Sequence, residues 1–261
     1  MKTQVTVKEM VELLEEMAPK ALAEDWDNVG LLWGRNDKHV HRILLALDMT
    51  SETVAQAIEY HADMLITHHP VIFRKLNQVT DAAWQQELLL RLAEHGIAAY
   101  SAHTNLDCVS GGVNDSLVKR LHIEDDDVLD TSNGLGRIGK VAPCTLADFA
   151  TFVKKALKAD YVVVGDAGRK VEKVAVCGGA GSDLIQLALA QGADTLVTGD
   201  VKYHSAQEAV FSGLNIIDAG HQPTELPVLD DLADRLSLHF ADRHWDINLK
   251  VAKESMLLKH I

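Results

Sequence analysis

The fold of this chain is decided by the stretch Met64-Leu65-Ile66-Thr67-His68-His69-Pro70, in which an apolar run leads directly into two adjacent histidines. The run Met64 to Thr67 predicts a short buried strand. Two imidazoles at the end of a buried strand are costly to place unless polar partners satisfy them. Metal ions are the obvious partners, so further metal ligands are expected elsewhere in the chain.

The strand before the histidines belongs to a unit that occurs twice. The first copy is predicted as a strand from Ile43 to Leu47, a helix from Ser51 to about Tyr60, and the strand Met64 to Thr67. The second copy aligns with it without a gap. It is predicted as a strand from Lys173 to Cys177, a helix from Ser182 to about Gln191, and a strand from Thr195 to Thr198. Such a repeat indicates two copies of one supersecondary unit.

The similarity continues beyond these strands. A helix from Ala82 to His95 leads into a glycine, an apolar strand and the motif His103-x-x-x-Asp107. A shorter helix from Ser205 to Phe211 leads into the same order and the motif His221-x-x-x-Glu225. Alternating strands and helices predict largely parallel sheets covered by helices. We therefore expect an α/β fold with two related lobes. Functional side chains should gather beyond the carboxyl ends of the strands, where the two lobes face a shared dinuclear metal site.

The predicted first lobe spans residues 1–125 and the second spans 126–261, with an inserted or linking subdomain at about 126–170. The sequence from Asp125 to Gly134 is polar and predicts turns, and Leu238 to Phe240 predicts a short strand. It stays open whether the C-terminal tail packs back on the first lobe. The segment Trp26 to Leu31 predicts a turn with a buried tryptophan.

Composition excludes several classes of protein. The 261 residues are 47% hydrophobic, and the formal net charge is −13 without a long basic block. This charge argues against nonspecific binding to nucleic acid or to a membrane surface. The three cysteines are widely spaced and odd in number, which favours buried thiols in a reducing compartment. The sequence lacks a signal peptide and any apolar stretch near the ~20 residues of a membrane span, so a cytoplasmic protein is predicted.

The metal prediction depends on spacing. In His221-x-x-x-Glu225 the two side chains face the same way on a helical turn, and Pro223 suits an early helix position. His103-x-x-x-Asp107 repeats this arrangement in the other lobe. His68 and His69 would point to opposite sides of an extended chain, so the pair could serve two ions if the chain turns at Pro70. Nitrogen and oxygen ligands suit Zn, Mn, Fe, Co or Ni, and open coordination positions favour a catalytic site.

Three further sites can be weighed. Asp200 and His204 align with the neighbourhood of His69 and are candidates for orienting a ligand or transferring a proton. The glycines Gly178 and Gly179 could let a substrate phosphate approach a helix N-terminus. The string Gly134-Leu135-Gly136-Arg137-Ile138-Gly139 fits a dinucleotide fingerprint, but it follows a polar stretch and precedes a strand, so a glycine-rich turn is the better interpretation.

The sequence from about Val5 to Phe240 resembles the GTP cyclohydrolase 1 type 2 family, also called the NIF-three-like family. The resemblance is carried by the motifs Trp26-Asp27-Asn28-Val29-Gly30-Leu31, His68-His69-Pro70, His103-Thr104-Asn105-Leu106-Asp107, Gly134 to Gly139, Thr198-Gly199-Asp200 and Gly220-His221-x-x-x-Glu225. It implies that two divalent metal ions are held by the residues matching the family's ligands, with the glutamate bridging both ions; these residues are His68, His69, Asp107, His221 and Glu225. His103 and His204 would line the cavity as proton shuttles.

The resemblance also implies a ring-shaped homohexamer and a GTP-opening activity in some members. A water activated by the metals could attack an electrophilic carbon such as C8 of a purine. The first hypothesis is therefore a metal-dependent hydrolase of a small, nucleotide-like molecule. The alternative is a non-enzymatic metal-binding scaffold or regulatory ring. The segment after Phe240 departs from the family pattern.

Overall fold

The computed structural model describes residues 4–258, which divide into two compact units. Unit 1 contains Met1–Val109 and Leu229–Ser255, and unit 2 contains Ser110–Val228 with the last residues from Met256. The chain therefore passes from unit 1 to unit 2 after Val109 and returns after Val228. Both units are α/β, as the sequence predicts.

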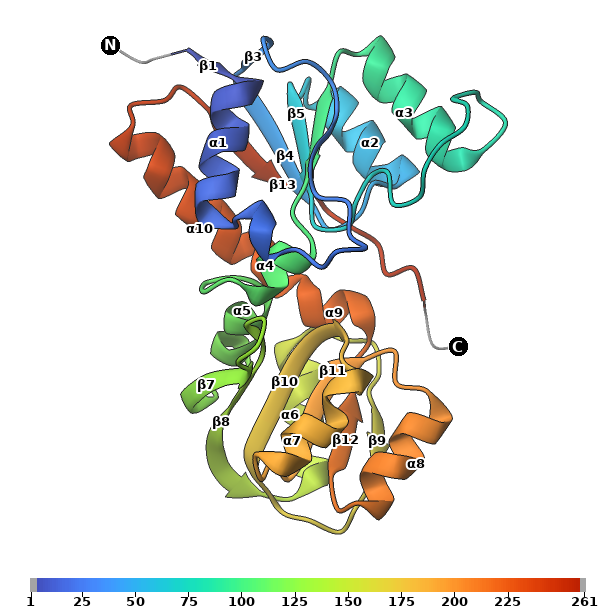
Figure 1. The fold of residues 1–261 in the computed structure, drawn as a ribbon, viewed down its shortest axis with the longest axis vertical. Helices are drawn as coiled ribbons and strands as arrows, with labels where there is room; N and C mark the ends of the chain where they lie inside the picture. Colours follow the sequence, from blue (N-terminus) through green and yellow to red (C-terminus); the bar gives the residue numbers. More distant parts are fainter. Residues whose placement is uncertain (1–3, 259–261) are drawn as a thin grey trace. The chain divides into compact units, whose positions relative to one another are not determined.

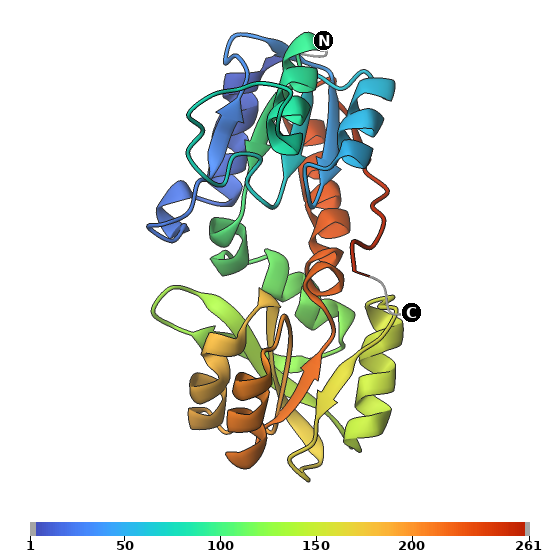
Figure 2. The same cartoon turned by 90° about the vertical axis from the view of Figure 1, so that its right-hand side faces the viewer.

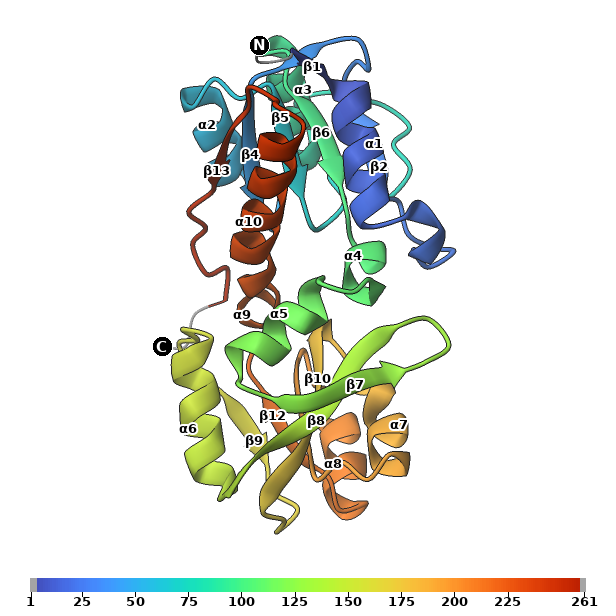
Figure 3. The same ribbon diagram turned by 90° about the vertical axis from the view of Figure 1, so that its left-hand side faces the viewer.

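Unit 1 is built on a five-stranded sheet with the order β13-β4-β5-β6-β2. It also contains a separate two-stranded antiparallel sheet, β1-β3. Strands β13, β4, β5 and β6 are parallel, and only β2 runs antiparallel to its neighbour. The elements are β1 (Val5–Thr6), α1 (Val7–Met17), η1 (Lys20–Leu22), β2 (Gly30–Trp33), β3 (His39–Val40), β4 (Arg42–Ala46), α2 (Ser51–Glu59), β5 (Met64–Thr67), α3 (Trp84–Glu94), β6 (Ala98–Ser101), α4 (Thr104–Cys108) and β13 (Asn248–Val251). Helices α2 and α3 cover one face of the sheet, and α1 and α10 (Pro227–Asp242) cover the other (Figures 1 and 3).

Unit 2 is built on a six-stranded sheet with the order β7-β8-β10-β11-β12-β9. Strands β10, β11 and β12 are parallel, and the other three join antiparallel. The elements are α5 (Val113–Arg120), β7 (Glu124–Asp130), β8 (Leu135–Cys144), α6 (Leu146–Ala156), β9 (Val163–Gly165), β10 (Val171–Ala180), η2 (Ser182–Leu184), α7 (Ile185–Ala190), β11 (Thr195–Gly199), α8 (Tyr203–Phe211), β12 (Asn215–Asp218) and α9 (His221–Glu225). Helix α6 covers one face of this sheet, and α7 and α8 cover the other (Figure 2).

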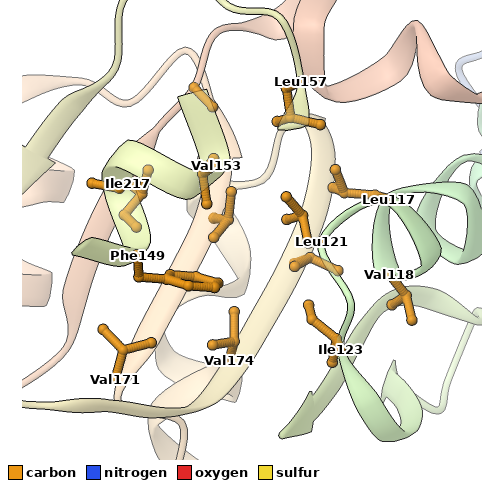
Figure 4. Close-up of a cluster of buried hydrophobic side chains, with 14 of the residues drawn as sticks. Leu117, Val118, Leu121, Ile123, Phe149, Val153, Leu157, Val171, Val174 and Ile217 are labelled. Carbon is orange, nitrogen blue, oxygen red and sulfur yellow. The ribbon is translucent and has the colours of Figure 1, made fainter. Parts of the chain in front are cut away.

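Alternating side chains of the unit 2 strands belong to two separate hydrophobic layers. Val174 and Val176 of β10 face α5 and α6, where they pack with Leu117, Phe149 and Val153 (Figure 4). Their neighbours Ala175 and Cys177 face the other way, into the layer under α7 and α8. Because side chains alternate across a strand, one apolar run supplies both layers, which explains why β10 has no polar face.

The duplication predicted from the sequence is visible in the strand register. Ile43 pairs with Met64 in unit 1, and the equivalent residues Val174 and Thr195 pair in unit 2. In each unit, an aspartate accepts the same pair of backbone hydrogen bonds from the neighbouring strand. Asp63 Oδ2 accepts hydrogen bonds from the amides of His41 and Arg42 at 2.8 and 3.0 Å.

In unit 2 the equivalent Asp194 Oδ2 accepts from the amides of Glu172 and Lys173 at 2.9 and 2.6 Å. The aspartate that precedes each second strand therefore fastens it to the start of the first strand. The sequence alignment paired Asp63 with Asp194, but only the hydrogen bonds explain why both copies have this residue.

Three local predictions were wrong. Residues 124–130 form strand β7, which pairs with β8, because tertiary pairing overrides the low strand propensity of the acidic run. Leu238 to Phe240 continue helix α10, whose buried side chains include Leu232, Leu236 and Phe240. Trp26 is 61% exposed and not buried.

The glycine-rich string at 134–139 forms a hairpin turn and the start of β8, as the sequence favoured over a dinucleotide site. The amide of Gly134 donates to the carbonyl of Asp130 at 2.8 Å, and Gly134 has a φ of 89° that suits glycine. The buried Arg137 of this string donates through Nε to Asp115 and through Nη1 to the carbonyls of Gly134 and Gly136 at 2.9 and 2.7 Å. Its role is to fasten α5 to the hairpin.

None of the three cysteines forms a disulfide in the part of the chain that the structure describes; Cys108 and Cys177 are buried and Cys144 is half-buried. None of the helices in residues 4–258 is both long enough and apolar enough to cross a membrane.

Candidate metal centre

Three imidazoles gather at the carboxyl ends of β5 and β6 in unit 1. They belong to His68 and His69, which follow β5, and to His103, which follows β6. The ring centroids are 5.0 to 5.4 Å apart, and one nitrogen from each ring lies within 4.8 Å of the others. Because parallel strands end at the same edge of a sheet, residues 34 positions apart in sequence become neighbours here. The group could hold a metal ion.

His68 and His69 do not point to opposite sides of the chain, as extended backbone would require. Strand β5 ends at Thr67, and the amides of both histidines bond back to the end of the neighbouring strand, at the carbonyls of Ala46 and Leu47. The chain bends at these residues, before Pro70, so both rings join one cluster. The alternation that holds within a strand is lost once the strand ends.

Each imidazole of this cluster is oriented by an acceptor at its Nδ1 atom. His68 Nδ1 lies 2.8 Å from the carbonyl oxygen of Ala102, and His69 Nδ1 lies 2.9 Å from Asp48 Oδ1. His103 Nδ1 lies 2.9 Å from Asp27 Oδ1. An acceptor at Nδ1 fixes the proton there and makes Nε2 the basic, ligating nitrogen. This is the arrangement expected of histidines that bind metal.

A carboxylate lies next to the cluster. The short helix α4 places Asp107 one turn after His103, and Asp107 Oδ1 is 3.6 Å from His68 Nε2. Both side chains are nearly buried. The His103-x-x-x-Asp107 spacing thus brings a carboxylate oxygen next to His68, and the role of Asp107 as a metal ligand stays a prediction.

Asp27 is one of the residues of unit 1 whose role the sequence analysis missed. Its carboxylate is fully buried and accepts hydrogen bonds from His103 Nδ1, from the Thr104 amide at 3.1 Å and from Thr104 Oγ1 at 2.5 Å. Burial by itself raises the pKa of Asp27, but the hydrogen bonds from His103 and Thr104 outweigh it and lower the pKa from 3.8 to about 2.

Replacing Asp27 by asparagine is therefore expected to destabilise the protein at neutral pH. Because the folded-state pKa is lowered, the stabilisation is present above pH 3.8 and is lost as the pH falls towards 2. We expect Asp27→Asn to cost on the order of 1–2 kcal/mol at pH 7, with the difference shrinking between pH 4 and 2. Urea unfolding of both proteins across this range measures it. A difference that does not change with pH would show that the charge of Asp27 is not the cause.

Unit 2 carries a second donor pair on the short helix α9. His221 Nε2 lies 3.2 Å from Glu225 Oε1, since one helical turn separates them. Asp200 Oδ2 lies 2.7 Å from His221 Nδ1, so Asp200 orients this imidazole as Asp48 and Asp27 orient those of unit 1. Glu225 is buried, whereas Asp200 is exposed. Asp200 also adopts a φ of 55°, uncommon for a residue with a side chain.

The glycines after β10 lie against this pair. A Cβ atom on Gly179 would lie 2.4 Å from Glu225 Oε1 and 3.2 Å from His221 Nε2. The amides of Gly178 and Gly179 donate to Asn114 Oδ1 at 3.0 Å and Thr224 Oγ1 at 2.9 Å. The glycines thus make room for the Glu225 carboxylate. Their contact with substrate stays a prediction.

His204, by contrast, is exposed on α8, and its ring lies edge-on to that of Tyr203, with the ring centroids 5.4 Å apart. A proton-transfer role for His204 stays a prediction.

Asp48 and Glu254 support His69 and were also missed. The Glu254 carboxylate accepts hydrogen bonds from the amides of Leu47 and Asp48 at 2.6 and 3.1 Å. Burial raises the pKa of Glu254 to about 7; the amide donors and His69 oppose this rise, while Asp48 adds to it. The position of Asp48, two residues after the end of β4, is the signal that could have identified it. Nothing in the local sequence could have signalled Glu254, since it lies 206 residues from Asp48 in the chain.

Comparison with known proteins agrees with these motifs. A family model described as Duf34/NIF3 (NGG1p interacting factor 3) matches residues 5–256. The chain belongs to the Duf34/NIF3 family. Among curated members, a GTP cyclohydrolase 1 type 2 homolog of Clostridium perfringens is 34% identical, with 95% of this chain and 97% of the relative covered. One of Lactococcus lactis is 36% identical, with 91% of each covered.

Solved structures of other proteins share the fold. A Bacillus cereus protein related to NIF3 has a TM-score of 0.94 at 26% identity, covering 98% of this chain and 99% of that one. A hypothetical protein of Staphylococcus aureus has a TM-score of 0.93 at 29% identity, covering 99% and 100%. The family resemblance and the two-lobed α/β fold expected from the sequence are both confirmed.

Proposed function

We propose that this chain is a dinuclear metal-dependent hydrolase that acts on a small, nucleotide-like molecule. Two divalent ions would be held by His68, His69, Asp107, His221 and Glu225. The observation that carries the proposal is the orientation of the imidazoles of the three proposed histidine ligands. In each of His68, His69 and His221, Nδ1 lies within 2.9 Å of an oxygen acceptor, which leaves Nε2 as the ligating atom.

A second observation behind the proposal is where the two acidic donors lie along the chain. Asp107 lies three residues before Ser110, where unit 2 begins, and Glu225 lies three residues before Val228, where unit 2 ends. Within unit 2, α5 follows the first passage and α9 precedes the second. The two helices share a neighbour, because Gly178 donates to Asn114 of α5 and lies against Glu225 of α9. Asp107 on α4 and Glu225 on α9 thus each belong to a short helix next to a point where the chain passes from one unit to the other.

The donor chemistry suits the proposed ions. Imidazole nitrogen and carboxylate oxygen favour Zn, Mn, Fe, Co or Ni, and the donors do not separate these metals. Two such ions, when bound, would lower the pKa of a water molecule towards ~7. The carboxylates of Asp107 and Glu225 would neutralise part of the positive charge. Asp27, Asp48 and Asp200 would keep the imidazoles in place by accepting hydrogen bonds from their Nδ1 atoms.

His103 is the proposed proton carrier in unit 1. Its Nδ1 is held by the buried carboxylate of Asp27, and such a partner stabilises an imidazole that gains a second proton at Nε2. His103 therefore has the environment that a proton shuttle needs. His204 is proposed as a second carrier, and Gly178 and Gly179 as substrate contacts.

We further propose that the protein is cytoplasmic and assembles into a homohexameric ring. The net charge of −13 favours a small-molecule substrate over nucleic acid. The alternative function, a metal-binding scaffold or regulatory ring, would have the same ligands but no turnover.

The test begins with elemental analysis of the purified protein, followed by assays of GTP and related heterocycles after loading with Mn, Fe or Zn. We expect about two ions per chain. His68→Ala and Glu225→Ala should each lower metal affinity by roughly 100-fold or more and abolish turnover, because each removes a direct ligand. His95→Ala is the matched control: His95 is exposed, and its Nδ1 lies 2.8 Å from a backbone carbonyl without any neighbouring ligands.

Two results would contradict the proposal. A metal content below one ion per chain would eliminate the dinuclear site. Bound metal with no turnover across a broad panel of heterocycles would favour the scaffold.

A further inference from the structure

Two exposed aromatic side chains lie beside the histidine cluster of unit 1. Trp26 is 61% exposed and Phe73 is 49% exposed. Their ring centroids are 6.0 Å apart at an angle of 65°. Each also meets His103 edge to face, at 6.0 Å and 74° for Trp26 and at 6.3 Å and 77° for Phe73. The two rings and the imidazole therefore form one aromatic group, which we call the aromatic wall.

The loops that carry the aromatic wall are tied together by polar contacts. Asn28 Nδ2 donates to the carbonyl of Ile72 at 2.6 Å, which joins the loop of Trp26 to the loop of Phe73. Asp27, between Trp26 and Asn28, holds His103. The three residues Trp26-Asp27-Asn28 thus place one ring, fix the imidazole and anchor the second loop.

A further pair of contacts holds the Phe73 loop to the sheet and to α3. The Val71 amide donates to Ser101 Oγ at 3.2 Å, and Gln85 Nε2 donates to the Val71 carbonyl at 2.9 Å. Rings on anchored loops lose little entropy when a ligand binds, so the wall is pre-organised for binding. An exposed aromatic pair that only filled space would not need such anchoring.

We infer that Trp26 and Phe73 bind the planar ring of an aromatic heterocycle, such as a nucleobase, beside His103. This rests on the proposed function and specifies which part of the substrate unit 1 recognises. Heterocycles stack on aromatic side chains through their π faces, and every purine, pyrimidine or pteridine has such a face. The wall therefore selects for a flat ring next to the His103 imidazole. Trp26 and Phe73 are specificity-determining residues.

The test measures binding by the full-length, Zn-loaded protein with isothermal titration calorimetry. Guanosine is the aromatic probe, and ribose 5-phosphate is the probe without a base. We expect Trp26→Leu and Phe73→Leu to weaken guanosine binding by roughly tenfold each, which is the usual effect of removing one stacking ring. Trp26→Phe should retain most of the affinity. Trp84→Leu is the matched control, since Trp84 is 71% exposed at the start of α3 in the same unit.

Zinc content measured on the same samples separates this inference from the proposed function. Trp26→Leu should keep its metal. If guanosine binding depends on Trp26 but the protein shows no turnover, the inference stands and the proposed hydrolase activity fails. Equal guanosine affinity in Trp26→Leu and Trp84→Leu would overturn the inference. So would the absence of guanosine, cytidine and pterin binding by the unaltered protein. Loss of self-association in Trp26→Leu at unchanged affinity would overturn it too, by assigning the wall to a subunit interface.

Discussion

Gly179→Ala is expected to weaken metal binding at least tenfold, whereas Gly192→Ala should leave it unchanged. The added Cβ would lie 2.4 Å from Glu225 Oε1, a distance that real contacts do not reach. The Glu225 side chain can swing away to relieve this clash. It would then no longer hold its carboxylate beside His221. Misplacing one ligand costs metal affinity in the range seen when a supporting residue is removed, roughly 10–100-fold.

The control separates the clash from backbone strain. Gly179 has a φ of 63° and Gly192 a φ of 79°, so alanine is strained at both positions. Nothing lies within 4 Å of a Cβ on Gly192. Both variants should therefore lose about 1 kcal/mol of stability, and only Gly179→Ala should lose metal. Zinc titration and urea unfolding of the two variants measure these effects. Equal metal affinity in both would remove the role assigned to Gly179.

Asp115→Ala should destabilise the protein by about 3 kcal/mol, because it leaves the buried guanidinium of Arg137 without its carboxylate partner. Arg137 donates through Nε to Asp115, which also accepts from the Gly111 amide. This pair joins the start of α5 to β8. Removing one member of a buried pair costs more than the pair contributes, since the remaining charge keeps its desolvation penalty.

Asp37→Ala is the matched control for this ion pair. Asp37 forms a 2.8 Å pair with Arg35, but both side chains are largely exposed. Its removal should leave the midpoint of urea unfolding unchanged within error, since water replaces the lost contact. If Asp115→Ala unfolds at the same urea concentration as Asp37→Ala, the Asp115–Arg137 pair does not stabilise the contact between α5 and β8.

The agreement between sequence and structure is best where the signal is local. The apolar runs at Ile43, Met64, Val174 and Thr195 become the central strands β4, β5, β10 and β11. The spacing in His221-x-x-x-Glu225 becomes one turn of α9. In each case the interaction joins residues a few positions apart, so the pattern carries the geometry.

Two of the three wrong predictions share one cause. Trp26 was expected to be buried in a turn, yet it is 61% exposed, with its ring beside those of Phe73 and His103. The acidic run at 124–130 has low strand propensity, and it becomes a strand because β8 supplies its hydrogen bonds. Both outcomes depend on partners distant in the chain or in another strand, which local pattern does not encode.

The sequence by itself determined the duplicated α/β units, the family and the histidine and carboxylate motifs, since periodicity and spacing are properties of the chain. Only the tertiary structure decided which acceptor orients each imidazole. Asp48 lies 21 residues from His69, and Asp27 lies 76 residues from His103. These pairs form because parallel strands bring their carboxyl ends to one edge of a sheet, where loops distant in sequence meet. The adjacent histidines that follow β5 are therefore predicted ligands by sequence, and the fold brings their rings together with that of His103.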